Sequence, residues 1–371
     1  MKLTVARKEF ADALKNVLKA VAVKTQTPIL AGVYFKAESS TLELQATDHS
    51  LGIVSKVAAN VEESGETAIV GKKLFEIVLK LSGDTLTITS DDTKAEIKSA
   101  GTKYNLVVLN PADFPKIKQE ESTKEILLRQ RNFKNLLKKT TFAAADDKET
   151  SRPIFTGVLF KVEGENLTLA ATNTHRLAVV TEKISEVEGN LEYLIPAKTL
   201  QEISTMLDEV GEIKISFSDK NAFFAFNNFL VTTRLISGNF PDFSKLLNEK
   251  RSISVTVSPQ DFLQALERVA IIAKETKYNT ADLDFADNEI KISSTSADVG
   301  KAEENVPAEI EGGEFTRSVF ILQISFNCKY LTDVLKVIDA EKIKIGMSGA
   351  LAPLDFQENN FRYIVTPVRR N

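Results

Sequence analysis

The sequence repeats itself three times at a spacing of about 125 residues, and this repetition limits the folds that it can adopt. The segment PILAGVYFKAES begins at Pro28, and PIFTGVLFKVEG begins at Pro153, 125 residues later. A predicted strand follows each segment and places Thr47 and Thr172 at the same spacing, and a weaker third copy, IKISSTS, places Thr295 a further 123 residues along. We therefore predict three similar domains in tandem. Their predicted limits are 1–121, 122–250 and 251–371.

Apolar residues recur at helical spacing in six segments, two in each repeat. These segments are 7–24 and 71–81, 129–146 and 196–207, and 258–275 and 327–339. Between them lie short alternating runs such as DTLTITS and EIKISFSD, which are typical of antiparallel strands. Each repeat is thus predicted to hold two β-α-β-β-β units of about 60 residues, with polar linkers at 116–124 and 246–252. The predicted fold class is α+β, with two helices packed on antiparallel sheets in each domain.

Positive charge is concentrated in the predicted helices. The whole chain has a net charge of -4, whereas the six helical segments together carry +8 and the rest of the chain -12. In the segment 129–146, Arg131, Lys134 and Lys138 lie on one stripe away from the apolar face, and the segment 7–24 has a similar stripe. Such a stripe is either an ordinary solvated helix face or a surface that follows a polyanion without reading bases. The single sign of the charge favours a polyanion for the first two repeats, whereas the third repeat's helices are neutral.

The sequence lacks the motifs of several classes of enzyme. It contains no G-x-x-x-x-G-K-[ST], no G-x-G-x-x-G after a strand, no H-E-x-x-H and no G-x-S-x-G. Two histidines and one cysteine, Cys328, cannot form a histidine- or thiolate-rich metal site or an internal disulfide. We expect no catalytic residues, no metal and no cofactor. With no apolar signal core and no run long enough to cross a bilayer, we expect a cytoplasmic protein without a membrane partner.

One of the two histidines lies in the segment ATNTHRLAVV, beside an arginine. His175 could act as a general base, because histidine titrates near neutrality. It could also be a structural histidine, or the wall of a binding pocket. Neither an acid partner nor a nucleophile lies near it in the sequence, which favours the pocket wall. Only the second repeat carries this His-Arg pair, so the pattern predicts one docking point on each chain.

The residues resemble a known family, the β subunits of bacterial DNA polymerase III, or sliding clamps. The resemblance extends over the whole chain and is carried by the three repeats, ATNTHRLAVV, GNFPDF at 238–243 and the segment YIVTPVRRN. It implies that two chains join head to tail into a closed ring of six domains, with helices facing duplex DNA and sheets outside. Such a ring is a non-catalytic processivity factor that binds DNA independently of sequence, tethers the replicative polymerase and is opened by a clamp loader.

The resemblance also implies a pocket for short, partly hydrophobic peptides from polymerases, the clamp loader and repair proteins. By position, its wall would comprise Arg152, Phe155, Thr172, Thr174, His175, Arg176, Leu177, Pro241, Leu246, Ile364, Thr366, Pro367, Val368 and Arg369. The chain departs from the family pattern at Asn173-Thr174, where Asp-Gly or Asp-Ser is common. It also departs at Pro153-Ile154, where some relatives have aromatic residues, and in ending with Arg370-Asn371.

Two further surfaces follow from the same resemblance. The expected DNA contacts are Lys24, Lys72, Lys73, Arg152 and Lys198, to which the charged stripe adds Lys134 and Lys138. At the junction between two chains, Tyr104 of the first domain would pack near Ile271 and Ile272 of the third.

Two other functions remain compatible with the residues. A protein built from repeats could serve as a peptide-binding adaptor that does not bind DNA. Less in keeping with the missing motifs, an enzyme could use His175 and Arg176 on a small anionic substrate.

Overall fold

The computed structural model describes residues 1–118, 124–185, 189–286, 288–312, 322–349 and 351–368. Within these residues the same order of eight strands and two helices occurs three times, which confirms the predicted repeat and its β-α-β-β-β units. The first copy consists of β1 (Lys2–Ala6), α1 (Arg7–Val17), β2 (Gly32–Glu38), β3 (Thr41–Thr47), β4 (Leu51–Glu63), β5 (Gly65–Val70), α2 (Gly71–Lys80), β6 (Thr85–Ser90), β7 (Lys94–Ser99) and β8 (Thr102–Leu109).

The second and third copies follow the same plan. The second consists of β9 (Glu125–Arg129), α3 (Gln130–Thr140), β10 (Gly157–Glu163), β11 (Asn166–Thr172), β12 (Arg176–Lys183), β13 (Leu191–Pro196), α4 (Ala197–Ser204), β14 (Glu212–Phe217), β15 (Asn221–Phe226) and β16 (Phe229–Arg234). The third consists of β17 (Ile253–Val257), α6 (Pro259–Ala273), β18 (Thr280–Ala286), β19 (Glu289–Ser296), β20 (Gly300–Gly312), β21 (Leu322–Asn327), α7 (Cys328–Leu335), β22 (Ile343–Met347), β23 (Leu354–Glu358) and β24 (Phe361–Val365).

All six predicted helices are present, but each is shorter than its apolar pattern. The segment predicted as a helix over 7–24 leaves the α conformation after Val17 and continues as a 3-10 turn, Leu18–Ala20. One short helix, α5 (Ser244–Asn248), lies between β16 and β17 and overlaps the stretch 246–252 that we predicted to be a linker. A helix of five residues is too short for an apolar periodicity to announce it.

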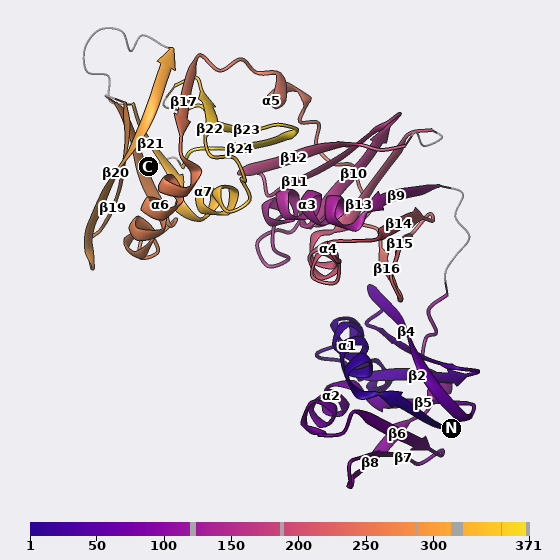
Figure 1. The fold of residues 1–371 in the computed structure, drawn as a ribbon. Coiled ribbons are helices and arrows are strands. Elements are labelled where there is room, and N and C mark those ends of the chain that lie inside the picture. Colours follow the sequence, from indigo (N-terminus) through magenta and orange to yellow (C-terminus); the bar gives the residue numbers. More distant parts are fainter. Residues whose placement is uncertain (119–123, 186–188, 287, 313–321, 350, 369–371) are drawn as a thin grey trace. The chain divides into compact units, whose positions relative to one another are not determined.

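The chain forms two compact units. The first comprises Met1–Lys134 and Thr199–Leu235, and the second comprises Asn135–Lys198 and Ile236–Asn371. Each unit holds one continuous antiparallel sheet of twelve described strands (Figure 1). The strand order is β1-β6-β7-β8-β5-β2-β3-β4-β16-β15-β14-β9 in the first unit and β13-β10-β11-β12-β24-β23-β22-β17-β20-β19-β18-β21 in the second. The second repeat therefore contributes strands to both sheets.

The pairing of strands from different repeats makes each sheet continuous. In the first unit β4 pairs with β16, so that Leu51 lies opposite Thr233. In the second unit β12 pairs with β24, so that Arg176 lies opposite Val365. Backbone hydrogen bonds thus fix the register of the repeats within each unit.

The helices bury their apolar stripes against one face of each sheet (Figure 1). In α1, Phe10, Leu14 and Val17 are fully buried, as the helical spacing predicts. In α6, Ser258 caps the N-terminus, since its Oγ accepts a hydrogen bond from Asp261 N at 3.3 Å and Pro259 occupies the first turn. The described helices include none that is long and apolar enough to span a membrane.

A buried ion pair lies inside the second unit. Lys139 Nζ lies 2.6 Å from Glu358 Oε2, and the two side chains are only 6% and 4% exposed. The other carboxylate oxygen of Glu358 accepts hydrogen bonds from the backbone N–H groups of Asp339 and Ala340. Because neither charge reaches water, each depends on the other for compensation.

We expect that Lys139→Met lowers the free energy of unfolding of the protein by about 3 kcal/mol, because it leaves Glu358 buried without its cation. Chemical denaturation followed by circular dichroism measures this change. The matched control is Lys183→Met, which removes an exposed lysine that lies 3.8 Å from Glu165, and it should cost less than about 1 kcal/mol. Equal losses for the two variants would contradict the assignment.

Candidate functional site

A tight turn between β11 and β12 holds the segment that contains His175. Thr172 Oγ1 donates to Arg176 O at 2.6 Å and accepts from Thr174 N at 3.1 Å. Asn173 Oδ1 accepts from the N–H groups of His175 and Arg176, each at 3.1 Å. Short polar side chains therefore satisfy the turn's backbone, as Asx and Ser/Thr turns do.

The first repeat contains the same turn. Thr47 Oγ1 donates to Leu51 O, and Asp48 Oδ1 accepts from the N–H groups of Ser50 and Leu51. In both turns the third residue has a positive φ, 73° at His49 and 78° at Thr174. The scaffold is thus repeated, whereas the side chains that it presents differ.

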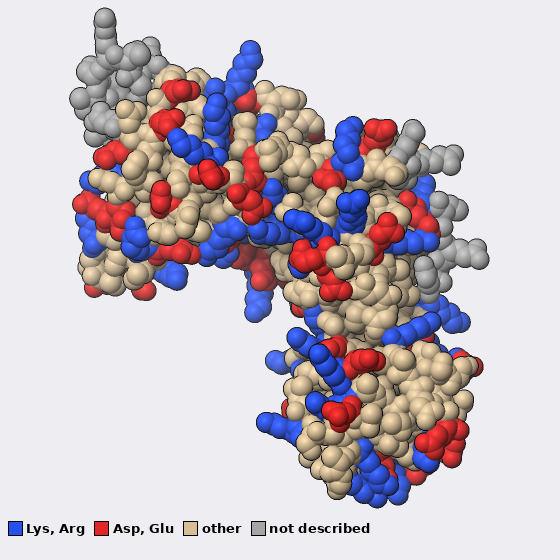
Figure 2. All heavy atoms as spheres, viewed as in Figure 1, with Lys and Arg blue, Asp and Glu red and all other residues tan. Residues whose placement is uncertain are grey.

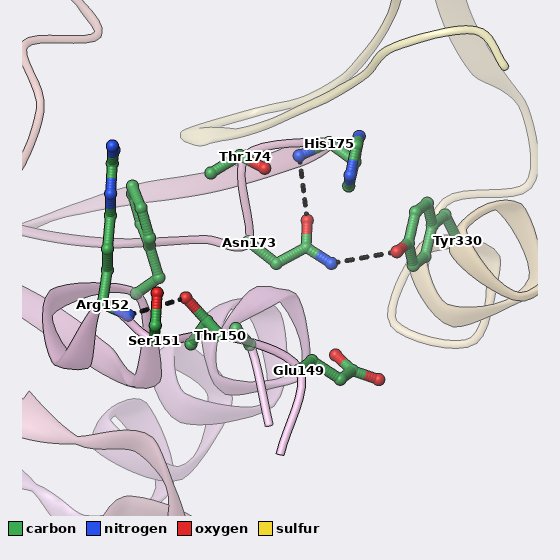
Figure 3. Close-up of a pocket in the computed structure, with 10 residues that line it drawn as sticks. Glu149, Thr150, Ser151, Arg152, Asn173, Thr174, His175 and Tyr330 are labelled. Atoms are coloured by element: carbon green, nitrogen blue, oxygen red, sulfur yellow. Dashed lines mark hydrogen bonds between the residues drawn. The ribbon is translucent and has the colours of Figure 1, made fainter. Parts of the chain in front are cut away.

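A pocket of about 480 Å³ opens beside the turn of the second repeat (Figure 3). Its lining residues are Ala145, Glu149, Thr150, Ser151, Arg152, Phe155, Asn173, Thr174, His175 and Tyr330. We call this cavity the His175 pocket. Four of the residues that we predicted from the sequence line it, namely Arg152, Phe155, Thr174 and His175.

The third repeat closes one side of the His175 pocket. Tyr330 lies in the first turn of α7 and is half-buried. Its ring lies nearly parallel to that of His175, with the ring centroids 6.5 Å apart, and its hydroxyl accepts a hydrogen bond from Asn173 Nδ2 at 3.1 Å. The sequence prediction missed Tyr330, and it also missed the segment Glu149–Ser151. The segment could have been found, because it immediately precedes the repeated Pro153 motif, but no local pattern marks Tyr330.

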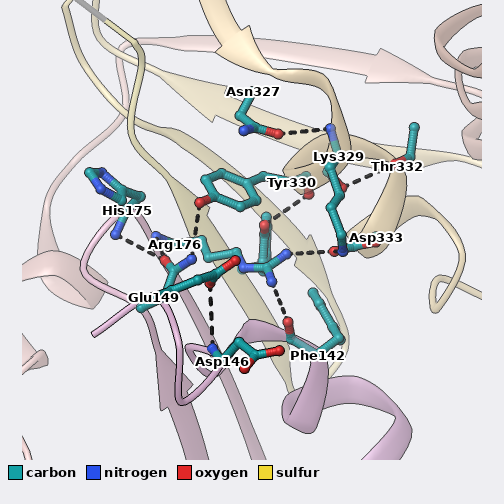
Figure 4. A network of polar contacts seen from close by, with 12 residues as sticks. Phe142, Asp146, Glu149, His175, Arg176, Asn327, Lys329, Tyr330, Thr332 and Asp333 are labelled. Atoms are coloured by element: carbon teal, nitrogen blue, oxygen red, sulfur yellow. Dashed lines mark hydrogen bonds and ion pairs between the residues drawn. The ribbon is translucent and has the colours of Figure 1, made fainter. Parts of the chain in front are cut away.

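Arg176 lies beneath the pocket and does not line it (Figure 4). Its Nη1 forms an ion pair with Asp333 Oδ2 at 2.7 Å, its Nη2 donates to Phe142 O, and its guanidinium lies 4.5 Å from the Tyr330 ring centroid. The buried guanidinium of Arg176 thus packs against the face of the Tyr330 ring and helps to fix its position. Thr172 is also buried, and its hydroxyl belongs to the turn.

The remaining predicted pocket residues lie around an apolar cluster in the same unit. The cluster consists of Leu159, Ala170, Leu177, Val179, Leu194, Phe240 and Ile364. Pro241 and Leu246 are exposed, in the segment that follows Phe240. Thr366 donates to His175 O from both its N–H group and its hydroxyl, at 2.9 and 3.0 Å, and Val368 N donates to Ser325 O. Pro367 is half-buried between them, and Arg369 lies outside the described residues.

Buried hydroxyl and thiol groups near the site are in their neutral forms. Burial raises the pKa of the Tyr363 hydroxyl, which donates to Tyr330 O at 2.8 Å. Burial also raises the pKa of the Cys328 thiol to about 12. Cys328 is fully buried and packs in the core. Among the described residues, no cluster of His, Cys, Asp and Glu is arranged to hold a metal ion.

The predicted DNA-binding residues are basic groups on both units. Lys24, Lys72, Lys73 and Lys134 belong to the first unit, and Lys138, Arg152 and Lys198 belong to the second. Most are exposed, although Lys134 is paired with Glu209 and Lys138 with Asp339. On the first unit, basic side chains project from the side on which α1 and α2 lie (Figures 1 and 2).

The residues predicted for the junction between chains lie on exposed surfaces. Tyr104 is 37% exposed on β8, and Ile271 is 67% exposed on α6, where Ile272 is half-buried. Ile271 and Ile272 thus place apolar side-chain surface on the outward face of α6.

Comparison with known proteins gives one consistent family. Models of the DNA polymerase III beta subunit match the chain in order, with the N-terminal domain over 1–118, the central domain over 127–242 and the C-terminal domain over 244–369. The beta sliding clamp of Staphylococcus aureus is 29% identical over 383 residues, covering 100% of this chain and 99% of the relative.

Solved structures agree with the sequence matches. The DNA polymerase sliding clamp of Bacillus subtilis superposes with a TM-score of 0.91 at 30% identity and covers 100% of both chains. A sliding clamp from Pseudomonas aeruginosa, solved with bound griselimycin, has the same TM-score at 27% identity and the same coverage. The fold of three tandem clamp domains and the resemblance inferred from the sequence are thereby confirmed.

Replacing Thr174 by glycine should stabilise the protein by about 0.5–1 kcal/mol. A β-branched residue is strained at φ 78°, and relief of that strain exceeds the entropy that glycine adds to the unfolded chain. Thr181→Gly in β12 is the control, because it removes a favourable strand residue whose hydroxyl contacts that of Thr168. It should lower the stability by about 1 kcal/mol. Denaturation midpoints that move in the same direction would contradict this account.

Proposed function

This chain belongs to the family of DNA polymerase III beta subunits, and from that premise we propose that two copies close head to tail into a ring around duplex DNA. The chain is a sliding clamp, a non-catalytic processivity factor of a replicative polymerase. The proposal concerns how it carries out this role: the assembly, the DNA contacts and the docking of partners. The observation that carries the last of these is the pocket beside His175, which lies on a turn whose hydrogen bonds the first repeat shares.

Open strand edges support the head-to-tail assembly. Over Thr102–Val107, β8 pairs only with β7 among the described strands, and over Gly300–Pro307, β20 pairs only with β19. Open edges tend to pair with another chain, and joining β8 of one protomer to β20 of its partner would use both. Tyr104, Ile271 and Ile272 would bury apolar surface at that junction. Because the two surfaces differ, the contact is heterologous, and two copies can use both of their surfaces only by closing into a ring.

Basic side chains on the helical sides of the domains support the contact with DNA. Lys24, Lys72, Arg152 and Lys198 make no ion pair with any described residue, and Lys73, Lys134 and Lys138 have only exposed or half-exposed acidic neighbours. Such groups neutralise phosphates without reading bases, so affinity should fall with salt. A closed ring needs no stronger contact with DNA than this, because it encircles the duplex and is topologically linked to it.

The His175 pocket and the apolar cluster beside it support peptide docking. The pocket supplies polar groups, while the apolar cluster of Leu177 and Ile364 supports Leu247, whose neighbour Leu246 is exposed. Apolar lining with a few polar anchors suits a short, partly hydrophobic peptide. The peptides would come from the replicative polymerase, the clamp loader and repair proteins, and Arg369 would complete the wall with Thr366, Pro367 and Val368.

Domain limits of 1–121, 122–250 and 251–371 and a cytoplasmic location complete the proposal. The family models begin and end within nine residues of these limits.

Loaded by a clamp loader and ATP, the protein should stay on nicked circular DNA through gel filtration and be lost when the circle is cut. Linear DNA lets a closed ring slide off, whereas a surface-bound protein would remain. Equal retention on circles and linear DNA would contradict encirclement, and no binding to either would favour an adaptor without DNA.

The assembly is tested with Ile271→Asp, which places a carboxylate in the apolar junction. The dissociation constant of the dimer should rise by at least about a hundredfold in sedimentation experiments, and retention on circles should be lost. Leu351→Asp is the control, because Leu351 is 77% exposed in the same unit and lies outside the proposed junction. A wild-type protein that sediments only as a monomer at micromolar concentration would contradict the ring.

His175→Ala should weaken binding of griselimycin about tenfold, because the variant loses the wall that faces Tyr330. Griselimycin is the probe because the similar Pseudomonas aeruginosa clamp was solved with it. Isothermal titration measures the affinity, and sedimentation should show an intact dimer. The control is His49→Ala, which changes the other histidine in the equivalent turn of the first repeat and should have no effect on binding.

A further inference from the structure

The helix α5 packs against the apolar cluster that contains Leu177 and Ile364, although it is far too short to be stable alone. It spans only Ser244–Asn248, and a single helical turn does not repay the entropy of forming it. Leu246 is 42% exposed, whereas Leu247 packs against the apolar cluster that contains Leu177 and Ile364. Something else in the structure must therefore hold this helix in place.

Side chains secure both ends of α5. At its start, Asp242 Oδ1 accepts from Ser244 N at 2.9 Å and from Ser244 Oγ at 2.5 Å. At its end, two arginines donate to carbonyls that have no helical partner. Arg251 Nη2 lies 3.5 Å from Leu246 O, and Arg362 Nη2 lies 3.3 Å from Leu247 O. Cations at the C-terminal end of a helix also complement its dipole.

One buried carboxylate binds Arg362 and lies close to Arg251. The side chain of Asp355 in β23 is fully buried, and its two oxygens accept from Arg362 Nε, at 2.9 Å, and from Arg362 Nη2. Arg251 Nε lies 3.6 Å from Asp355 Oδ2, and the side chain of Arg251 is only 5% exposed. Its Nη1 also forms an ion pair with Glu249 Oε2 at 2.6 Å. Gly346, opposite Asp355 in β22, leaves the necessary space, since a Cβ there would lie 2.8 Å from Arg251 Cγ.

We propose that Asp355 is a positioning residue for partner binding: through Arg251 and Arg362 it fixes α5, and thereby Leu246 and Leu247, beside the peptide pocket. This inference rests on the peptide docking proposed above. A wall that is already ordered spares the ligand the entropic cost of ordering it, so loss of the tether weakens binding without removing any contact atom. Asp355 is not among the residues that line the His175 pocket, so its proposed effect on binding is indirect and passes through the arginines that contact α5.

The test is Asp355→Asn, which keeps the shape of the side chain and removes the charge that aligns two guanidinium groups. The affinity for griselimycin should fall about five- to tenfold in isothermal titration. Amide hydrogen exchange over residues 246–250 should become faster, since the helix opens more often. Sedimentation and retention on nicked circular DNA should be unchanged, because neither depends on α5.

The matched control is Glu358→Gln on the same strand. Glu358 lies three residues along β23, on its opposite face, and is equally buried in its ion pair with Lys139. This variant should lower stability while leaving the affinity for griselimycin and the hydrogen exchange of α5 unchanged. If Glu358→Gln weakened binding as much as Asp355→Asn, the effect would be one of general stability and the positioning role would be overturned.

A second variant covers the case in which Asp355→Asn does not fold. Arg362→Lys keeps a cation beside Asp355 but loses the planar fork that reaches Asp355 and Leu247 O together, so binding should weaken two- to fivefold. Wild-type affinity in whichever variant folds would overturn the positioning role and leave the pocket standing. Failure of the wild-type protein to bind griselimycin would instead overturn the proposed pocket, and this inference with it.

Discussion

Backbone hydrogen bonds between strands of different repeats are the constraint on which the rest of the structure depends. At β4–β16 and at β12–β24 the sheet passes from one repeat to the next without interruption (Figure 1). A shift of one residue in either register would turn every side chain of the strand to the other face. The turn with His175 begins where the β12–β24 pairing ends, and Thr366 extends that pairing by donating to His175 O. The pocket is therefore held in place by the junction of two repeats.

The corresponding turn of the first repeat presents a different surface. Its turn has the same hydrogen bonds, but Gly52 stands where the second repeat has Leu177. The side chain of Ile117 occupies the space, since a Cβ on Gly52 would lie 2.9 Å from Ile117 Cδ1. In the first repeat Ile117 thus occupies the space beside Gly52, whereas in the second repeat Leu177 stands at this position and belongs to the apolar cluster. A repeated scaffold acquires one specialised copy through changes at a few positions.

Local pattern predicted much of the fold, because helical and strand periodicities are properties of neighbouring residues. The three repeats, the helices and the strand that contains Thr172 all followed from such patterns. Tyr330 did not, since it reaches His175 from 155 residues away along the chain. Arg176 was predicted to line the pocket and instead lies beneath it, because Asp333 and Phe142 supply buried partners that no spacing in the sequence reveals. The helix α5 was missed because hydrogen bonds from Arg251 and from the distant Arg362 support it, and five residues are too few to show a helical periodicity.

Asn173 has a consequence for what the pocket offers to a ligand. Its Oδ1 accepts the two N–H groups of the turn, and its Nδ2 donates to the hydroxyl of Tyr330. In the first repeat the same position is Asp48, whose carboxylate can only accept. An aspartate at 173 would instead accept a hydrogen bond from the Tyr330 hydroxyl, and the hydroxyl proton would then not be available to a ligand. With asparagine at 173, the Tyr330 oxygen accepts the amide N–H, and the hydroxyl proton of Tyr330 remains available to donate. The pocket therefore offers a ligand a hydrogen-bond donor suited to a carbonyl or carboxylate oxygen.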